Sequence, residues 1–221
     1  MAGWIVLILA FLLFSVSLFL LLRLLLRTRR EKKRLNAKVG KTLNYLADEK
    51  DFLLLHDVKV TLLNDTEPTS FGHILFGNRY IYIIETLVGF GALYGNVKDP
   101  YLFLKKEDGS NAQIVNPLPA LKRKCEKLEK ACSCSSKDRR FVSVVVYNNS
   151  LDAPKGIARK EQNTWFLPYK DLEKTIKLAE KDEVSAISHQ QTDDIAIKLK
   201  SISDQTKSER KRRRKNGRKK S

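Results

Sequence analysis

Apolar and polar positions divide the chain into parts with different patterns, and the first part is almost entirely apolar. From Trp4 to Leu22 every residue is apolar or small, and Ser15 and Ser17 are the only polar ones. At a rise of about 1.5 Å per residue, one helix of this length spans a hydrocarbon core of about 30 Å. No Lys or Arg precedes the run and no small-residue cleavage site follows it, which favours an uncleaved anchor over a signal peptide or a buried core helix.

Behind the apolar run, the pattern changes to that of a helix followed by strands. Leu35, Val39, Leu43 and Leu46 recur at helical spacing, which predicts a helix over residues 30–50 whose start is either a linker or a continuation of the anchor. Alternating and β-branched segments then predict an antiparallel meander with a Gly77-Asn78 hairpin turn. Its strands are expected at residues 56–63, 70–76, 79–85, 93–97, 101–105 and 112–115.

The second half of the chain alternates between helical and strand patterns. Pro117 is expected to open a helix that runs to about Cys134, because the first turn of a helix tolerates proline. The nearly continuous apolar run Phe141–Tyr147 is typical of a strand buried on both faces. A short strand at residues 164–167 and helices at 170–180 and 184–202 follow. This order predicts an α/β (α+β) fold in which a mixed central β-sheet is flanked by helices.

The net charge of +17 is concentrated in two short segments. Residues 23–34 hold seven Lys or Arg and one acid, Glu31, and residues 210–221 hold nine basic residues and no acid. Setting these aside leaves 26 of the 42 basic residues and 24 of the 25 acidic ones. The part of the chain between the two clusters is therefore nearly neutral, unlike a domain that binds nucleic acid over its whole surface.

The first basic cluster predicts an orientation in the membrane. Short basic flanks are retained on the cytoplasmic side, so we expect a single-pass protein of the cell membrane with its N-terminus outside and its domain cytoplasmic. Three clustered cysteines are too few for a secreted disulfide framework, which agrees with a reducing compartment. The residues expected to contact anionic lipid headgroups are Arg29, Arg30, Lys32, Lys33 and Arg34.

The second basic cluster has no apolar residue to pack, which predicts a disordered tail. We expect it to be a solvated tail, to lie on the same leaflet, or to bind nucleic acid through sequence-independent phosphate contacts. A nuclear-localisation signal does not fit an integral membrane protein. The basic residues of the tail are Arg210, Lys211, Arg212, Arg213, Arg214, Lys215, Arg218, Lys219 and Lys220.

These patterns predict five consecutive regions. Residues 1–27 form the transmembrane anchor and residues 28–54 the juxtamembrane basic linker with the first helix. The main domain covers residues 55–180, a helical segment follows at 181–207, and the basic tail occupies 208–221. A main domain of this size is large enough to bury a hydrophobic core.

The predicted strands and the helix after them carry residues that resemble the nuclease-related domain (NERD) family, a branch of the restriction-endonuclease-like PD-(D/E)xK superfamily. The resemblance covers residues 38 to about 170. Its motifs are Gly72-His73-Ile74-Leu75, Gly77, Tyr80-Ile81-Tyr82-Ile83-Ile84-Glu85-Thr86, Gly89, Tyr94-Gly95-Asn96 and Asn116-Pro117-Leu118. His73, Asn116 and Pro117 belong to the family's structural pattern.

The resemblance implies a metal-dependent nuclease site, of which this chain keeps one residue. In the superfamily an Asp and a Glu on adjacent strands hold Mg²⁺, and a Lys beside the Glu positions the attacking water. Here Gly72 occupies the Asp position and Leu87 the Lys position, and the first-helix Gly-Glu reads Gly40-Lys41. The Gln expected after Asn-Pro is also absent, since Ala120 stands there. Glu85 alone survives.

We therefore expect a catalytically inactive, membrane-anchored NERD-like module that binds or scaffolds, without a metal or cofactor. One alternative is an active, Mg²⁺-dependent nuclease whose site has been rebuilt with Asp57 or Asp65. Another is a non-enzymatic tether that acts through its basic tail. His56, His73 and His189 are scattered in the sequence, and the cysteines lack zinc-ligand spacing, so neither set predicts a metal site. Trp165 and Phe166 are expected in the core.

Overall fold

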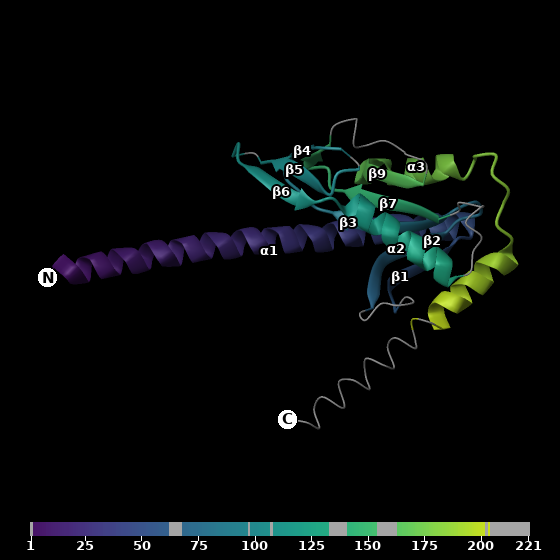
Figure 1. The fold of residues 1–221 in the computed structure, drawn as a ribbon, viewed down its shortest axis with the longest axis horizontal. Helices are drawn as coiled ribbons and strands as arrows, with labels where there is room; N and C mark the ends of the chain where they lie inside the picture. The colour runs from purple at the N-terminus through teal and green to yellow at the C-terminus, as the bar shows by residue number, and fades with distance from the viewer. Residues whose placement is uncertain are drawn as a thin grey trace, which may run out of the picture.

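A long helix, α1 (Ala2–Lys50), runs out of a compact α/β domain in the computed structural model (Figure 1). The structure describes residues 2–61, 68–96, 98–106, 108–132, 141–153, 163–201 and 203, and for residues 2–10, 20–22, 24 and 25 the backbone alone. The helix is continuous from the apolar run into residues 30–50, so the start of the predicted helix continues the apolar segment. It ends where Asp51 adopts a left-handed φ of 55° and Phe52 N–H donates to Ala47 O, a common helix C-cap arrangement.

The predicted membrane span receives no support from the structure. Among the described residues, no helix combines the length and the apolarity that crossing a membrane requires. Residues 4–10 and 20–22 of the predicted span lie outside the residues whose side chains are described. The anchor therefore stays a prediction from the sequence.

The central sheet contains five strands in the order β1-β2-β3-β7-β9. They are β1 (Leu53–Val60), β2 (Thr69–Phe76), β3 (Ile81–Leu87), β7 (Phe141–Tyr147) and β9 (Thr164–Pro168). The first three are antiparallel, whereas β7 pairs parallel with both β3 and β9. Every residue of β7 is buried, which confirms the prediction of a strand covered on both faces.

A second sheet corrects the prediction of one central sheet and one continuous meander. Its four strands lie in the order β6-β5-β4-β8, namely β6 (Asn111–Val115), β5 (Tyr101–Lys105), β4 (Gly91–Tyr94) and β8 (Leu151–Asp152). The chain leaves the first sheet after β3 and enters the second at Gly91, which has a φ of 112°. A Cβ at Gly91 would lie 2.1 Å from Lys105 O, so only glycine permits this crossing. The two-residue strand β8 is too short to show a period in the sequence.

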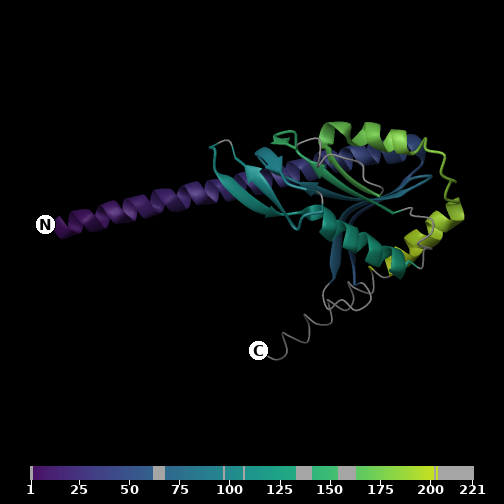
Figure 2. The same cartoon turned by 45° about the horizontal axis from the view of Figure 1, so that its top comes forward.

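Helices cover both faces of the central sheet. Figure 2 shows α1 and α3 (Leu172–Ala179) on one side, and α2 (Pro117–Ala131) with the helix at residues 189–201 on the other. A 3₁₀ turn, η2 (Tyr169–Asp171), precedes α3. The 189–201 helix starts five residues later than predicted because Ser188 and Gln191 form a capping box there, each side chain accepting from the other's backbone N–H.

Each face of the sheet has its own apolar core. On the α1 side, the predicted residues Leu35, Val39, Leu43 and Leu46 are buried against Tyr82 and other residues of β3, β7 and β9. On the α2 side, the core extends into the second sheet through Leu93 and Leu102 and is closed by Leu199 of the 189–201 helix. Trp165 and Phe166 are buried in opposite cores, which confirms that neither is a surface platform.

Candidate functional site

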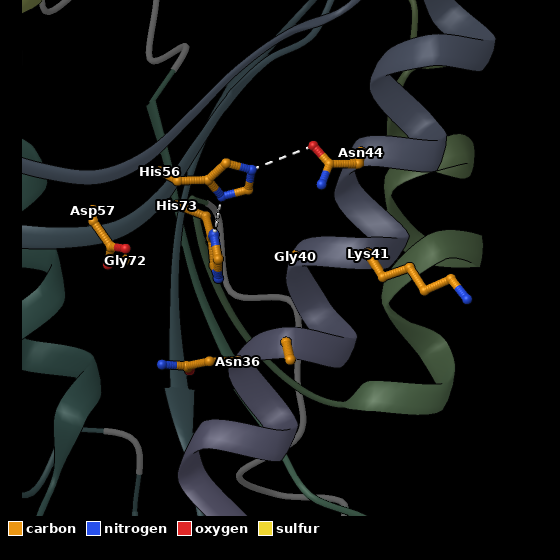
Figure 3. Close-up of a pocket in the computed structure, with 9 residues that line it drawn as sticks. Asn36, Gly40, Lys41, Asn44, His56, Asp57, Gly72 and His73 are labelled. Atoms are coloured by element: carbon orange, nitrogen blue, oxygen red, sulfur yellow. Dashed lines mark hydrogen bonds between the residues drawn. The ribbon is translucent and has the colours of Figure 1, made fainter.

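A hollow of about 440 Å³ lies between α1 and the first two strands (Figure 3). Its lining includes the two family positions at which carboxylates are missing, Gly40-Lys41 on α1 and Gly72 on β2. The other residues that line it are Asn36, Ala37, Asn44, His56, Asp57 and His73. Figure 3 shows the two imidazoles and Asn44 together, whereas the Lys41 side chain extends away from the strands.

Two histidines that are 17 residues apart in sequence meet in this hollow. β1 and β2 pair with His56 opposite His73, and their Nδ1 atoms lie 2.7 Å apart. His56 Nε2 lies 3.3 Å from Asn44 Oδ1, and an amide oxygen can only accept, so His56 Nε2 donates. In a neutral pair, His56 Nδ1 then accepts from the Nδ1–H of His73. The two histidines are far apart in the sequence, and the register of β1 on β2 brings them together.

Burial holds His73 in its neutral form. The His73 side chain is 8% exposed, and burial, followed by the nearby His56 and opposed by Asp57, lowers its pKa to about 4. The two rings meet edge to face with centroids 5.0 Å apart. Gly40 lies directly beside them, since a Cβ there would meet His73 Cε1 at 3.5 Å, an ordinary van der Waals distance. The neutral His73 thus contacts His56, which in turn hydrogen-bonds to Asn44 of α1, and this chain of contacts joins α1 to the sheet.

Asp57 lies beside the vacant Asp position on β2. In the β1–β2 register His56 pairs with His73 and Val58 with Phe71, so Asp57 and Gly72 fall at the irregular step between them. Asp57 has a left-handed φ of 49°, which is uncommon outside glycine but most accessible to Asn and Asp. Of the two carboxylates considered for a rebuilt site, Asp57 thus reaches the hollow, while Asp65 lies outside the described residues.

Glu85, the surviving family carboxylate, is paired with a lysine on the other side of the sheet. Its Oε1 accepts from Lys124 Nζ of α2 at 2.7 Å, and the two side chains are 27% and 32% exposed. Lys124 also lies 3.4 Å from Ser70 O. Glu85 does not belong to the described residues that line the hollow. The sequence analysis did not identify Lys124 as the partner of Glu85. The one feature of the sequence that points to it is its position on the helix that Asn116 and Pro117 begin.

Asn116 and Pro117, which belong to the family's structural pattern, start helix α2. Asn116 is the N-cap of α2: its Oδ1 accepts from Leu118 N–H at 3.1 Å, and its Nδ2 donates to Asp99 O at 2.8 Å. Pro117 occupies the first turn. Leu87, at the family's Lys position, packs against the core on the α2 side. This residue therefore contributes apolar contact where the family pattern has a charge.

The basic residues predicted to contact lipid or nucleic acid lie apart from the hollow. Those of the first cluster, Arg29, Arg30, Lys32, Lys33 and Arg34, are exposed on α1, and Arg34 pairs with Glu31 at 2.9 Å. The nine predicted tail residues from Arg210 to Lys220 lie outside the described residues. Their contacts therefore stay predictions.

The described part of the chain contains no group of three or more His, Cys, Asp or Glu side chains arranged to hold a metal ion. Cys125 and Cys132 are buried, and Cys134 lies outside the described residues. Ser143 Oγ donates to Cys125 Sγ at 3.0 Å, and burial raises the pKa of the Cys125 thiol to about 12. Both described cysteines are thus core residues.

Comparison with known proteins agrees with this arrangement of motifs. A family model described as "Nuclease-related domain" matches residues 33–148, just over half of the chain. The match begins on α1 shortly before the hollow and ends directly after β7, so it includes both the hollow and the Glu85–Lys124 pair. No curated protein and no solved structure matches the chain significantly.

Proposed function

The chain belongs to the nuclease-related domain family, and from that premise we propose that it is a member without nuclease activity, serving as a binding or scaffolding module at the cytoplasmic face of a membrane. The main observation that supports the proposed loss of activity is the ion pair between Glu85 and Lys124. A carboxylate that neutralises a lysine on one side of the sheet is not free to join a metal site in the hollow on the other.

The residues at the other positions of the family's catalytic set support the same proposal. Hydrolysis of a phosphodiester by the superfamily's mechanism needs several oxygen ligands for Mg²⁺ and a cation beside the attacking water. Gly72 offers no ligand, Leu87 offers no charge, and Lys41 stands at a position where the family has a carboxylate. The hollow instead presents two imidazoles and two side-chain amides, Asn36 and Asn44, which can donate and accept hydrogen bonds with a ligand.

A cleavage assay on the full chain in detergent tests this proposal. Plasmid and single-stranded DNA are incubated with Mg²⁺ or Mn²⁺ and compared with EDTA, for the unaltered chain, Glu85→Ala and Glu183→Ala. Glu183 is an exposed acid outside the family match, so its variant is the matched control. We expect no cleavage above the EDTA background. Metal-dependent cleavage lost in Glu85→Ala and kept in Glu183→Ala would overturn the proposal.

A rebuilt nuclease site is the second candidate, and the position of Asp57 favours it. Asp57 lines the hollow next to Gly72 and two imidazoles, so it stands close to the position of the missing carboxylate. The same assay with Asp57→Ala, beside the exposed control Asp48→Ala, separates the two candidates. Metal-dependent cutting that disappears in Asp57→Ala alone would establish the rebuilt site, whereas no cutting in any variant favours the inactive module.

Attachment to a membrane is the second part of the proposal. It is supported by the apolar run from Trp4 to Leu22 and by the basic residues that follow it in the sequence. Alkaline carbonate extraction of cell membranes tests it, and we expect the chain to stay with the lipid. Protease added to inside-out vesicles should remove the domain. Release by carbonate would reject the anchor.

Contact with nucleic acid through the tail is the third part, supported by nine basic residues without an acid between 210 and 221. Each phosphate that the tail neutralises should contribute a slope of about −0.7 to −0.9 in log affinity against log salt. A full chain and a variant ending at residue 207 are compared by mobility shift at several salt concentrations. Unchanged affinity and slope after truncation would reject the tail as a tether.

A further inference from the structure

The outer face of the second sheet exposes a group of aromatic and aliphatic side chains. Tyr94 pairs with Phe103 across β4 and β5, and Tyr101 pairs with Val115 across β5 and β6. Their exposed fractions are 50%, 53%, 47% and 69%, whereas Leu93 and Leu102 on the inner face are fully buried. Neighbours across and along strands share a face, so these four residues form one continuous patch, which we call the aromatic face.

The second sheet is held beside the part of α1 that follows the apolar run. The Arg27 guanidinium carbon lies 4.3 Å from the centre of the Phe90 ring, directly before β4. Arg27 is five residues past Leu22, which on a helix is about 8 Å. The headgroup layer of a bilayer is about 5–8 Å thick on each side. This contact therefore places the start of β4 at headgroup depth if the apolar run spans the hydrocarbon core.

The β5–β6 end of the sheet points toward the N-terminal half of α1 in both ribbon views (Figures 1 and 2). Lys105 shares the aromatic face, two residues after Phe103 on β5, and Lys106 follows it. Tyrosine and other aromatic residues are enriched where one part of a side chain is apolar and the other reaches water, and lysine extends its ammonium group from such surfaces to lipid phosphates. Asp152 is the carboxylate at the β8 edge of this face, opposite Ala92.

We propose that the aromatic face is a membrane-contact surface that lies in the headgroup layer of the anionic bilayer through which the anchor passes. The inference rests on the proposed anchor. A tilt of α1 of about 20°, the average for membrane helices, brings the sheet toward the lipid. The contact would fix the rotation of the domain on the membrane and so decide which of its other surfaces face the cytoplasm.

Site-directed fluorescence on the full chain in lipid nanodiscs tests the inference. A Cys134→Ser background leaves Cys125 and Cys132, which are buried, so an introduced cysteine takes the label. Phe103→Cys and Tyr101→Cys report on the aromatic face, and Leu178→Cys, 61% exposed on α3, is the matched control. Val16→Cys reports on the anchor. Nanodiscs of phosphatidylcholine and phosphatidylserine carry a nitroxide either on the headgroup or deep in the acyl chain.

We expect the headgroup nitroxide to quench the labels at residues 103 and 101 and not the label at 178, and the deep nitroxide to quench the label at 16. Quenching at 16 without quenching at 101 or 103 would overturn the membrane contact while leaving the anchor in place. No quenching at 16 would overturn the anchor and the contact that rests on it. Labels at 101 and 103 that are shielded from aqueous iodide yet unquenched by either nitroxide would assign the face to a protein partner or a second copy and overturn the lipid contact.

Discussion

Lys124 Nζ lies 2.7 Å from Glu85 Oε1, so the last carboxylate of the family's catalytic set is an ion-pair partner of α2. The pair joins the sheet to the helix at a half-buried position. Under the proposal that the chain lacks nuclease activity, Lys124 stabilises the Glu85 charge that a metal ion would otherwise balance.

Replacing Lys124 with Met should lower the free energy of unfolding by about 0.5–1 kcal/mol, since a partly exposed ion pair is worth little more. Lys122→Met, an exposed neighbour on the same helix, is the control and should change it less. Urea unfolding in detergent, followed by circular dichroism, measures both. Equal losses in the two variants would mean that the contact with Glu85 contributes nothing to stability.

The His56–His73 pair predicts a pH-dependent stability. The pKa of His73 falls from about 6.5 in the unfolded chain to about 4 in the folded one, so the unfolded state binds more protons between these values. The contribution of neutral His73 to the free energy of unfolding is complete above pH 6.5. Up to about 3 kcal/mol of this contribution is lost as the pH falls from 6.5 through 4. Comparing unfolding at pH 7 and pH 4.5, His73→Gln should show a weaker pH dependence than the intact chain.

The exposed His189 supplies the control for this experiment. His189→Gln should keep the pH dependence of the intact chain, because it leaves the buried His73 imidazole in place. The explanation fails if His73→Gln and His189→Gln give the same pH profile, since the loss at low pH would then come from other groups.

Gly77 and Glu180 are coupled across 103 residues of sequence. A Cβ at Gly77 would lie 2.3 Å from Glu180 Oε1, and that carboxylate is held in place by Tyr82 OH at 2.7 Å and Arg79 N–H at 3.0 Å. Gly77→Ala should therefore cost about 1–3 kcal/mol, the range for a substitution that disturbs a half-buried polar network. In a Glu180→Ala background the same change should cost clearly less, which a double-mutant cycle of unfolding free energies measures.

Cys125 should be chemically inert while the chain is folded. Burial raises the pKa of its thiol to about 12, so the reactive thiolate is scarce at pH 8. Mass spectrometry after a short exposure to iodoacetamide should find Cys125 unmodified in the native chain and modified in urea. Rapid native modification would contradict the buried position of this residue between α2 and β7.

Local features of the fold could be predicted because neighbouring residues determine them. Asn116 and Pro117 start α2 by capping its first N–H groups, and the apolar run Phe141–Tyr147 forms the strand it predicts. Boundaries set by tertiary contact were less accurate: β1 begins at Leu53 and not at His56, because the left-handed turn at Asp51 leads straight from α1 into the sheet.

The candidate site was predicted in part. The vacant positions at Gly72 and Gly40-Lys41 follow from the family motifs, and the structure brings them to one hollow. The histidine pair could not be predicted from the sequence. The connection between β1 and β2 is longer than a tight turn, so the sequence pattern does not show which residues of the two strands lie opposite each other. The partner of Glu85 did not follow either, because nothing local to α2 says which of its lysines faces the sheet.

The sequence by itself determined the family, the separation of charge into two basic clusters, the apolar N-terminal run and most of the helices and strands, since each depends on composition or on spacing along the chain. The tertiary structure alone decided that the strands divide into two sheets at Gly91, that His56 meets His73, and that Glu85 is bound to Lys124. These relationships join residues that are far apart in sequence, and they arise from packing and strand register, which no local pattern encodes.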